Sequence, residues 1–235
     1  MSKISYVATL FRAFFPSLLF NFRHLPWRQA IKLPILLYKP HILKQKGKIT
    51  IDSDNVRFGM IKMGFPTSAI FPYHSGITIK NEGELAFKGR CYIGNDCYLV
   101  CGKQGRIEFG ENFRVTAGLK MVSYCGISFG KETLIGWGCI IIDTNFHPLY
   151  DMEKKRFKKA FGKINIGDNN WFAAQVMVMP SVTTPEHCVF GAKTIVTRGG
   201  EYEPYCVHGG SPIKVLSRNV MRIIGQDCIN DYSIE

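Results

Sequence analysis

The chain has 235 residues, of which 46% are hydrophobic and 20% charged, a composition typical of a folded protein that excludes wholesale disorder. Its formal net charge is +12, and residues 1–50 hold nine Lys or Arg and no Asp or Glu. A basic lobe of this kind suits an anionic partner, such as a membrane surface, a lipid-linked phosphate or nucleic acid.

The N-terminal segment predicts an amphipathic helix over about residues 8–22. Its apolar residues follow the i, i+3, i+4, i+7 spacing: Leu10, Phe11, Phe14, Phe15, Leu18, Leu19 and Phe22. Pro16 is expected to kink the helix, and the apolar run is too short to span a bilayer. Two interpretations stay open: a helix packed on the protein or on a neighbouring subunit, or an interfacial helix on an anionic leaflet.

Residues 166–197 repeat with a period of six. The lead positions are Ile166, Phe172, Val178, Thr184, Phe190 and Val196, and a second apolar or β-branched set is Val176, Val182, Cys188 and Thr194. This period is typical of a coiled parallel β structure with one short strand and one turn per repeat. The same cassette recurs from Ile93, Phe109 and Phe129, and a weaker register reaches back to about Lys48. We predict an all-β repeat domain over 48–217, a basic segment over 1–47 and a tail over 218–235.

Two segments break the period, near residues 64–76 and 147–163. The second carries six basic residues against two acidic ones. A loop that projects from a rigid scaffold is a usual place for function.

The eight cysteines include no C-x-x-C pair and no zinc-finger spacing with histidine. Most fall at apolar repeat positions, where a free thiol acts as a small buried hydrophobe. We interpret them as reduced and the protein as cytoplasmic.

Three motifs carry a family resemblance: "DTNFHP" at 143–148, the repeat run from Ile164 to Gly200, and "VHGGSPIKVL" at 207–216. Together they resemble the hexapeptide-repeat acyltransferases, above all the maltose/galactoside-type acetyltransferases and the O-acetyltransferases of surface-polysaccharide clusters. The resemblance implies a left-handed parallel β-helix, a homotrimer, and acetyl-CoA as donor with active sites at subunit interfaces; the short N-terminal helical segment predicted above would precede that β-helix. Thr116 and Gly118 stand where the sugar acetyltransferases place an acceptor-binding Asn, which argues against maltose or galactoside as acceptor.

The resemblance assigns His147 as the general base that removes the proton of the acceptor hydroxyl, a role that suits histidine near neutral pH. Asp143 either fixes the imidazole or binds an acceptor hydroxyl, or it only forms a turn. The matching cofactor-binding positions are Ala174, Ala192, Thr197, Arg198 and Lys214. Asn145 and Trp171 match the acceptor side of the site.

The other histidines share no spacing that suggests a metal triad, so we expect no metal site. The leading hypothesis is an O-acetyltransferase that moves acetyl from acetyl-CoA to a hydroxyl of a bacterial surface glycan or its lipid-linked precursor. The enzyme is expected in the cytoplasm, either free or peripheral on the inner face of the membrane, with no nucleic-acid partner. Two alternatives remain: N-acetylation of an amino-sugar nucleotide, and a non-catalytic glycan- or membrane-binding β-helix.

Overall fold

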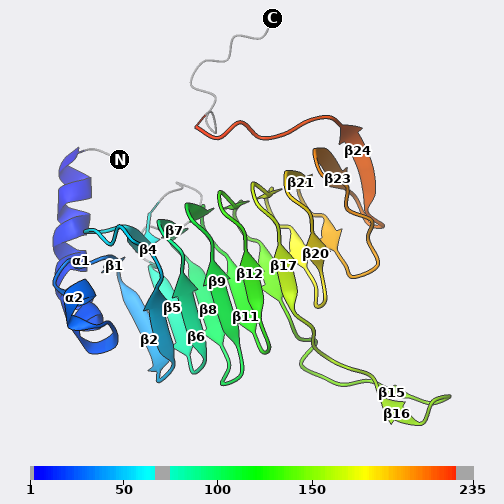
Figure 1. Ribbon diagram of the computed structural model, residues 1–235, viewed down its shortest axis with the longest axis horizontal. Helices are drawn as coiled ribbons and strands as arrows, with labels where there is room; N and C mark the ends of the chain where they lie inside the picture. Colours follow the sequence, from blue (N-terminus) through cyan, green and yellow to red (C-terminus); the bar gives the residue numbers. More distant parts are fainter. Residues whose placement is uncertain (1–2, 67–74, 226–235) are drawn as a thin grey trace, which may run out of the picture.

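The computed structural model describes residues 3–66 and 75–225, so residues 67–74 of the expected excursion at 64–76 lie outside it. Two helices, α1 (Lys3–His24) and α2 (Trp27–Ala30), precede a stack of short strands. Most strands form three sheets, in which the pairings are parallel except that of the last two strands, and successive strands of the stack pass from one sheet to the next (Figure 1). This is the left-handed parallel β-helix that the resemblance implied.

The three sheets, called A, B and C below, are the three walls of the prism. Sheet A contains, in spatial order, β1 (Ile35–Leu37), β4 (Ile61–Phe65), β7 (Cys91–Gly94), β10 (Phe113–Val115), β13 (Leu134–Ile135), β18 (Trp171–Phe172), β21 (Cys188–Phe190), β23 (Cys206–Gly209) and β24 (Lys214–Arg218). Sheet B contains β2 (Pro40–Gln45), β5 (Ile77–Asn81), β8 (Cys97–Cys101), β11 (Lys120–Ser123), β14 (Ile140–Ile142), β19 (Met177–Val178) and β22 (Ile195–Val196). Sheet C contains β20 (Thr183–Thr184), β17 (Ile164–Ile166), β12 (Ile127–Phe129), β9 (Arg106–Phe109), β6 (Glu84–Phe87) and β3 (Lys48–Ile51).

The six-residue period places the same two positions of each repeat inside the prism. All six lead positions of 166–197 are buried, and so is the second set at Val176, Val182, Cys188 and Thr194. One repeat cannot bury its own apolar face, so each coil is stabilised by its neighbours. The prediction of a stacked repeat core is confirmed.

The corners of the prism set the period. One residue per repeat adopts a positive φ in this region: Asn169 (58°), Gln175 (60°), Ser181 (67°), His187 (55°) and Lys193 (60°). A left-handed conformation costs a non-glycine residue about 1–2 kcal/mol. The packing of the coils must offset that cost at every corner.

Aromatic rings stack along the inside of the prism. The Phe87 and Phe109 ring centroids are 5.0 Å apart, and those of Phe172 and Phe190 are 4.7 Å apart. Such pairs contribute about 0.5–1.5 kcal/mol beyond the burial of their area.

The cysteines are part of this core, as their positions in the repeat predict. Six of the seven in the described ranges are buried: Cys91, Cys97, Cys101, Cys139, Cys188 and Cys206. Burial raises the pKa of the Cys97 and Cys188 thiols to about 12. At neutral pH these thiols are protonated.

The helix α1 lies across the N-terminal end of the stack (Figure 1), and the helix continues through Pro16. The first coil begins at β1, before the boundary expected at residue 48, because Ile35, Leu36 and Leu37 pair with β4. Between Lys3 and Gly225, leaving out 67–74, no helix is long and apolar enough to cross a membrane.

Candidate active site

The segment that contains Asp143 and His147 follows β14 at the corner between sheets B and C. The carboxylate of Asp143 is fully buried and accepts four hydrogen bonds. The donors are the Ser123 hydroxyl (3.1 Å) and the backbone N–H groups of Tyr124 (2.6 Å), Cys125 (2.8 Å) and Gly126 (2.7 Å). Asp143 therefore holds the turn of the preceding coil.

Asp143 and His147 face different environments. Strand alternation turns the side chains of Ile141 and Asp143 inward, while His147 is exposed. In the part of the chain that the structure describes, no hydrogen bond joins the Asp143 carboxylate to the imidazole. Of the roles considered for Asp143, the turn-forming one matches all four of its hydrogen bonds.

Backbone hydrogen bonds fix the position of His147. Its N–H donates to the carbonyl of Asn145 at 2.6 Å, and the Phe146 N–H donates to the Thr144 hydroxyl at 3.0 Å. Phe146 has a φ of 60°, so the chain turns sharply just before the histidine. Asn145 is tied across the stem of the loop by a 2.6 Å bond from its N–H to the Ala160 carbonyl. The exposed imidazole is thus presented on a short, braced turn.

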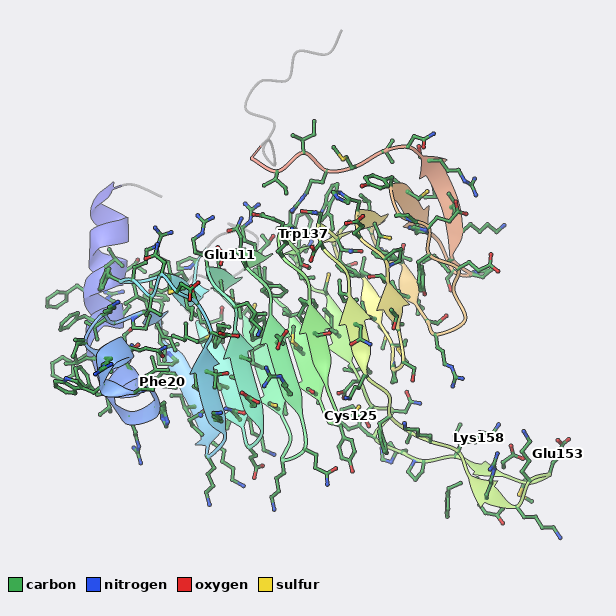
Figure 2. All side chains as sticks on the ribbon, viewed as in Figure 1. Phe20, Glu111, Cys125, Trp137, Glu153 and Lys158 are labelled. Carbon is green, nitrogen blue, oxygen red and sulfur yellow. The ribbon has the colours of Figure 1, made fainter. Side chains whose placement is uncertain are left out.

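Residues 147–163 project from the prism as an arm, as the break in the period predicts (Figure 1). Two short antiparallel strands, β15 (Tyr150–Asp151) and β16 (Arg156–Phe157), form its hairpin, with the Tyr150 and Phe157 rings in edge contact. Lys158 lies 3.7 Å from Asp151, and Figure 2 shows Lys158 and Glu153 at the far end of the arm. The remaining cations of the arm are exposed: Lys154, Lys155, Arg156, Lys159 and Lys163.

A cleft of about 760 Å³ lies at the C-terminal end of the prism and brings together two of the expected cofactor-binding residues, Thr197 and Lys214. Arg198 follows Thr197 in the chain and is exposed, although it does not line the cleft. Arg218, which belongs to none of the sequence motifs, also lines the cleft and forms a bidentate pair with Glu203 (3.1 and 2.8 Å). That hydrogen-bonded pair lowers the pKa of Glu203.

Ala174 and Ala192 occupy the other edge of sheet B, at the corner between sheets A and B. Their turns are stacked, because the Lys193 N–H donates to the Ala174 carbonyl at 3.0 Å. Lys214 pairs with Gly209, which lies beside Gly191 in the turn of Ala192, so the width of sheet B separates the alanines from Thr197 and not from Lys214.

The register of sheet B aligns the end of β14 with the end of β22. Ile141 pairs with Val178, which pairs with Val196. With strands about 4.8 Å apart, the turn that leads to His147 and the turn at Thr197 lie about 10 Å apart along one corner. Trp171 lies on a different wall, in sheet A between Leu134 and Val189, and is 37% exposed.

In the described parts of the chain, no group of three His, Cys, Asp or Glu side chains is placed to hold a metal ion.

Two known proteins with sequences similar to this chain are named as acetyltransferases. The chain is 33% identical over 128 residues to a Staphylococcus aureus protein named as an acetyltransferase, covering 46% of this chain and 62% of the relative. It is 29% identical over 129 residues to the galactoside O-acetyltransferase of Escherichia coli, covering 55% and 62%. Over about half of its length, the chain is therefore similar to proteins that are named as acetyltransferases.

The share of each relative's length that this chain matches differs between the two acetyltransferases and a third protein. The chain spans less than two thirds of the length of the two acetyltransferases. A Klebsiella pneumoniae protein described as lying in a cps region is 25% identical over 188 residues, covering 79% of this chain and 82% of its own length. No family model matches the chain.

Proposed function

We propose that the protein is an acetyl-CoA-dependent O-acetyltransferase that acts on a hydroxyl of a bacterial surface glycan or its lipid-linked precursor. The observation that carries the proposal is the alignment of the His147 turn and the Thr197 cleft along one corner of the prism. A base and a ligand cleft at one corner match what a transfer between two bound substrates requires.

His147 is the proposed base. Its exposed imidazole takes the proton of the acceptor hydroxyl as the oxygen attacks the acetyl carbonyl carbon. The carbon–sulfur bond then breaks, and the imidazolium returns the proton to the departing thiolate. The products are an O-acetyl ester and coenzyme A with a free thiol.

The C-terminal cleft is the proposed site for the phosphate end of acetyl-CoA. Lys214 and Arg198 are exposed cations at or beside it, and a guanidinium binds phosphate through two parallel hydrogen bonds. Two acidic side chains, Glu201 and Glu203, line the cleft. The charge of Glu203 is neutralised by Arg218, so Glu203 does not repel a bound anion. The donor set therefore fits a ligand that carries phosphate.

The active site is proposed to need two chains of a homotrimer. Trp171 lies on another wall of the prism from the His147 corner, and Ala174 and Ala192 lie at the far edge of sheet B. A groove between two protomers would take the His147 corner from one chain and Trp171 from its neighbour. The exposed apolar side chains of the arm suit contact with that neighbour or with the acceptor: Leu149, Tyr150, Met152 and Phe157.

The test is release of coenzyme A by the full chain, followed by chromatography, with acidic and neutral polysaccharides and an amino-sugar nucleotide as acceptors. We expect His147→Ala to lower turnover by about 10²–10⁴-fold without a change in unfolding temperature. His41→Ala, also at an exposed histidine, is the control and should keep full activity. Unchanged turnover in His147→Ala would contradict the role of His147 as the base. If the native chain released no coenzyme A with any acceptor, a non-catalytic binding protein would be favoured. Release only with the amine would favour N-acetylation.

Mixing the inactive variants His147→Ala and Trp171→Ala tests the shared site. Random assembly of the two chains in equal amounts would leave about a quarter of interfaces with both native groups, so activity should reappear. A mixture as inactive as its parts would place both residues in a site within one chain.

A further inference from the structure

The outward face of α1 is apolar and aromatic. Its side chains are exposed: Phe11 (83%), Phe14 (46%), Phe15 (78%), Leu19 (66%) and Phe22 (41%). We call these five residues the aromatic face of α1. An exposed apolar patch of this kind marks an interaction site for a protein or a membrane.

The opposite face of α1 explains why the aromatic face points outward. Asn21 donates to the Ile35 carbonyl (2.6 Å) and accepts from the Ile35 N–H (3.1 Å), and the Ser17 hydroxyl accepts from the Leu37 N–H (2.8 Å). These bonds satisfy backbone groups at the free edge of β1, which a first coil otherwise leaves unpaired. Ser17 and Asn21 are fully buried, so turning the aromatic face inward would leave their partners without hydrogen bonds.

The apolar surface continues beyond α1. Trp27 of α2 is 69% exposed, and its ring centroid lies 5.2 Å from that of Phe22. On the neighbouring strand β2, Ile42 and Leu43 are exposed, and a groove of about 410 Å³ separates them from α1. Residues from three elements therefore form one apolar surface at the end of the prism.

The charged residues on the two helices of this surface and just after them are all basic. Arg12, Arg23, Arg28 and Lys32 are exposed on α1, on α2 and just after it, and residues 1–51 contain no acidic residue. Asp54 is exposed, and the acidic groups on either side of it in the chain are paired: Asp52 with Lys88 at 2.7 Å and Glu82 with Lys44 at 2.5 Å. The positive charge beside the apolar surface is therefore left for an external anion.

We propose that the aromatic face of α1, with Trp27, docks on the surface of a bilayer that contains anionic lipid. Aromatic and Leu side chains flanked by Arg and Lys are typical of helices that lie in the plane of the interface. A second copy of the chain is the rival occupant, but two such faces would bring cations together without acidic groups to pair them. The charge of the surface favours the lipid.

Docking through this end of the prism leaves the rest of the molecule in water. In sheet B, β14 lies four strands beyond β2, which is about 19 Å along the prism. If the proposed function holds, His147 would stand about that far above the docked end, where it would meet sugars distant from a lipid anchor. The docking itself does not depend on the proposed function.

The test is flotation of the full chain with vesicles of phosphatidylcholine alone or with 30% phosphatidylglycerol. We expect binding to the anionic vesicles, at least tenfold weaker in the triple variant Phe11→Ser, Phe15→Ser, Leu19→Ser. The matched control is Leu216→Ser, at an exposed apolar residue of β24 at the opposite end of sheet A, which should bind like the native chain. All four substitutions are at exposed side chains, and circular dichroism checks that each variant is folded.

A charge pair of variants and a fluorescence measurement complete the test. Arg23→Glu with Lys32→Glu should weaken binding at least tenfold, while Lys103→Glu with Lys120→Glu, the same charge change at exposed sites on the coils, should leave it within about twofold. Brominated lipid should quench Trp27, and Trp27→Phe should remove that quenching. Absence of vesicle binding by the native chain, or equal binding by the triple variant, would overturn the proposal. A lower mass of the triple variant in sedimentation would assign the face to a subunit interface instead.

Discussion

The hydroxyl of Tyr202 is hydrogen-bonded to both backbone groups of Thr197. It donates to the Thr197 carbonyl at 2.5 Å and accepts from the Thr197 N–H at 2.9 Å. Thr197 lines the C-terminal cleft, and Tyr202 is half-buried with its ring against Phe190. The wall of the cleft is therefore anchored to the core of the last coils.

Tyr202→Phe tests this anchor. The variant keeps the ring and loses both bonds, so we expect about 1 kcal/mol less stability and a KM for acetyl-CoA about fivefold higher, with kcat little changed. Tyr205→Phe is the control, because the exposed Tyr205 ring stacks on His187 outside the cleft. An unchanged KM in Tyr202→Phe would show that the cleft does not bind the donor.

Asp143→Asn separates a structural role from a catalytic one. The amide keeps one acceptor oxygen but turns its NH₂ group toward buried backbone donors, so we expect a loss of about 3 kcal/mol of stability in urea unfolding. The exposed Asp54→Asn should change stability by less than about 0.5 kcal/mol. A fall in kcat at native stability would mean that Asp143 acts on His147 after all.

The six-residue period predicts the coils, their buried positions and the arm, because each corner repeats the same backbone turn and the same inward side chains. The orientation of α1 could not be predicted in that way. Periodicity shows that an apolar face exists, whereas its direction depends on the free edge of β1, which attracts the polar stripe of Ser17 and Asn21. For Asp143, the alternation of side chains along the strand predicts burial, because Asp143 lies two residues after the buried Ile141. Its position four residues before His147 instead suggested a catalytic role.

The buried His208 gives the stability a predictable dependence on pH. Its Nε2 accepts the Glu203 N–H at 3.1 Å, and desolvation lowers the pKa of the imidazole below its usual 6.5. The unfolded chain then binds a proton that the folded chain does not, so stability is complete above pH 6.5 and falls as the pH drops below it. His208→Gln should reduce the slope of the unfolding free energy against pH between pH 5 and 7, while the substitution His41→Gln at an exposed histidine should leave that slope unchanged. Equal slopes in both variants would contradict this origin.

Thiol accessibility tests the core. The substitution Cys228→Ser removes the one cysteine outside the described residues and leaves seven thiols. Of these seven, Cys125 is half-buried and the other six are buried. We expect one thiol to react with a disulfide reagent in the native state and all seven after unfolding in guanidinium, because burial raises the pKa of the core thiols. Cys125→Ser should abolish the native reaction, and rapid labelling that remains would mean that the coils open.

Asn21→Ala tests the cap on which the position of α1 depends. Removing the amide leaves the Ile35 N–H and carbonyl without their side-chain partner, and we expect a loss of about 2 kcal/mol. The loss should be local, since the other coils keep their strand pairing, so hydrogen exchange should quicken in residues 9–24 and β1 but not in β11 or β14. The control Gln29→Ala removes a single 3.1 Å bond from α2 to the Ile51 carbonyl and should leave exchange in α1 unchanged. Uniformly faster exchange through all coils would instead mean that α1 and the prism unfold as one cooperative unit.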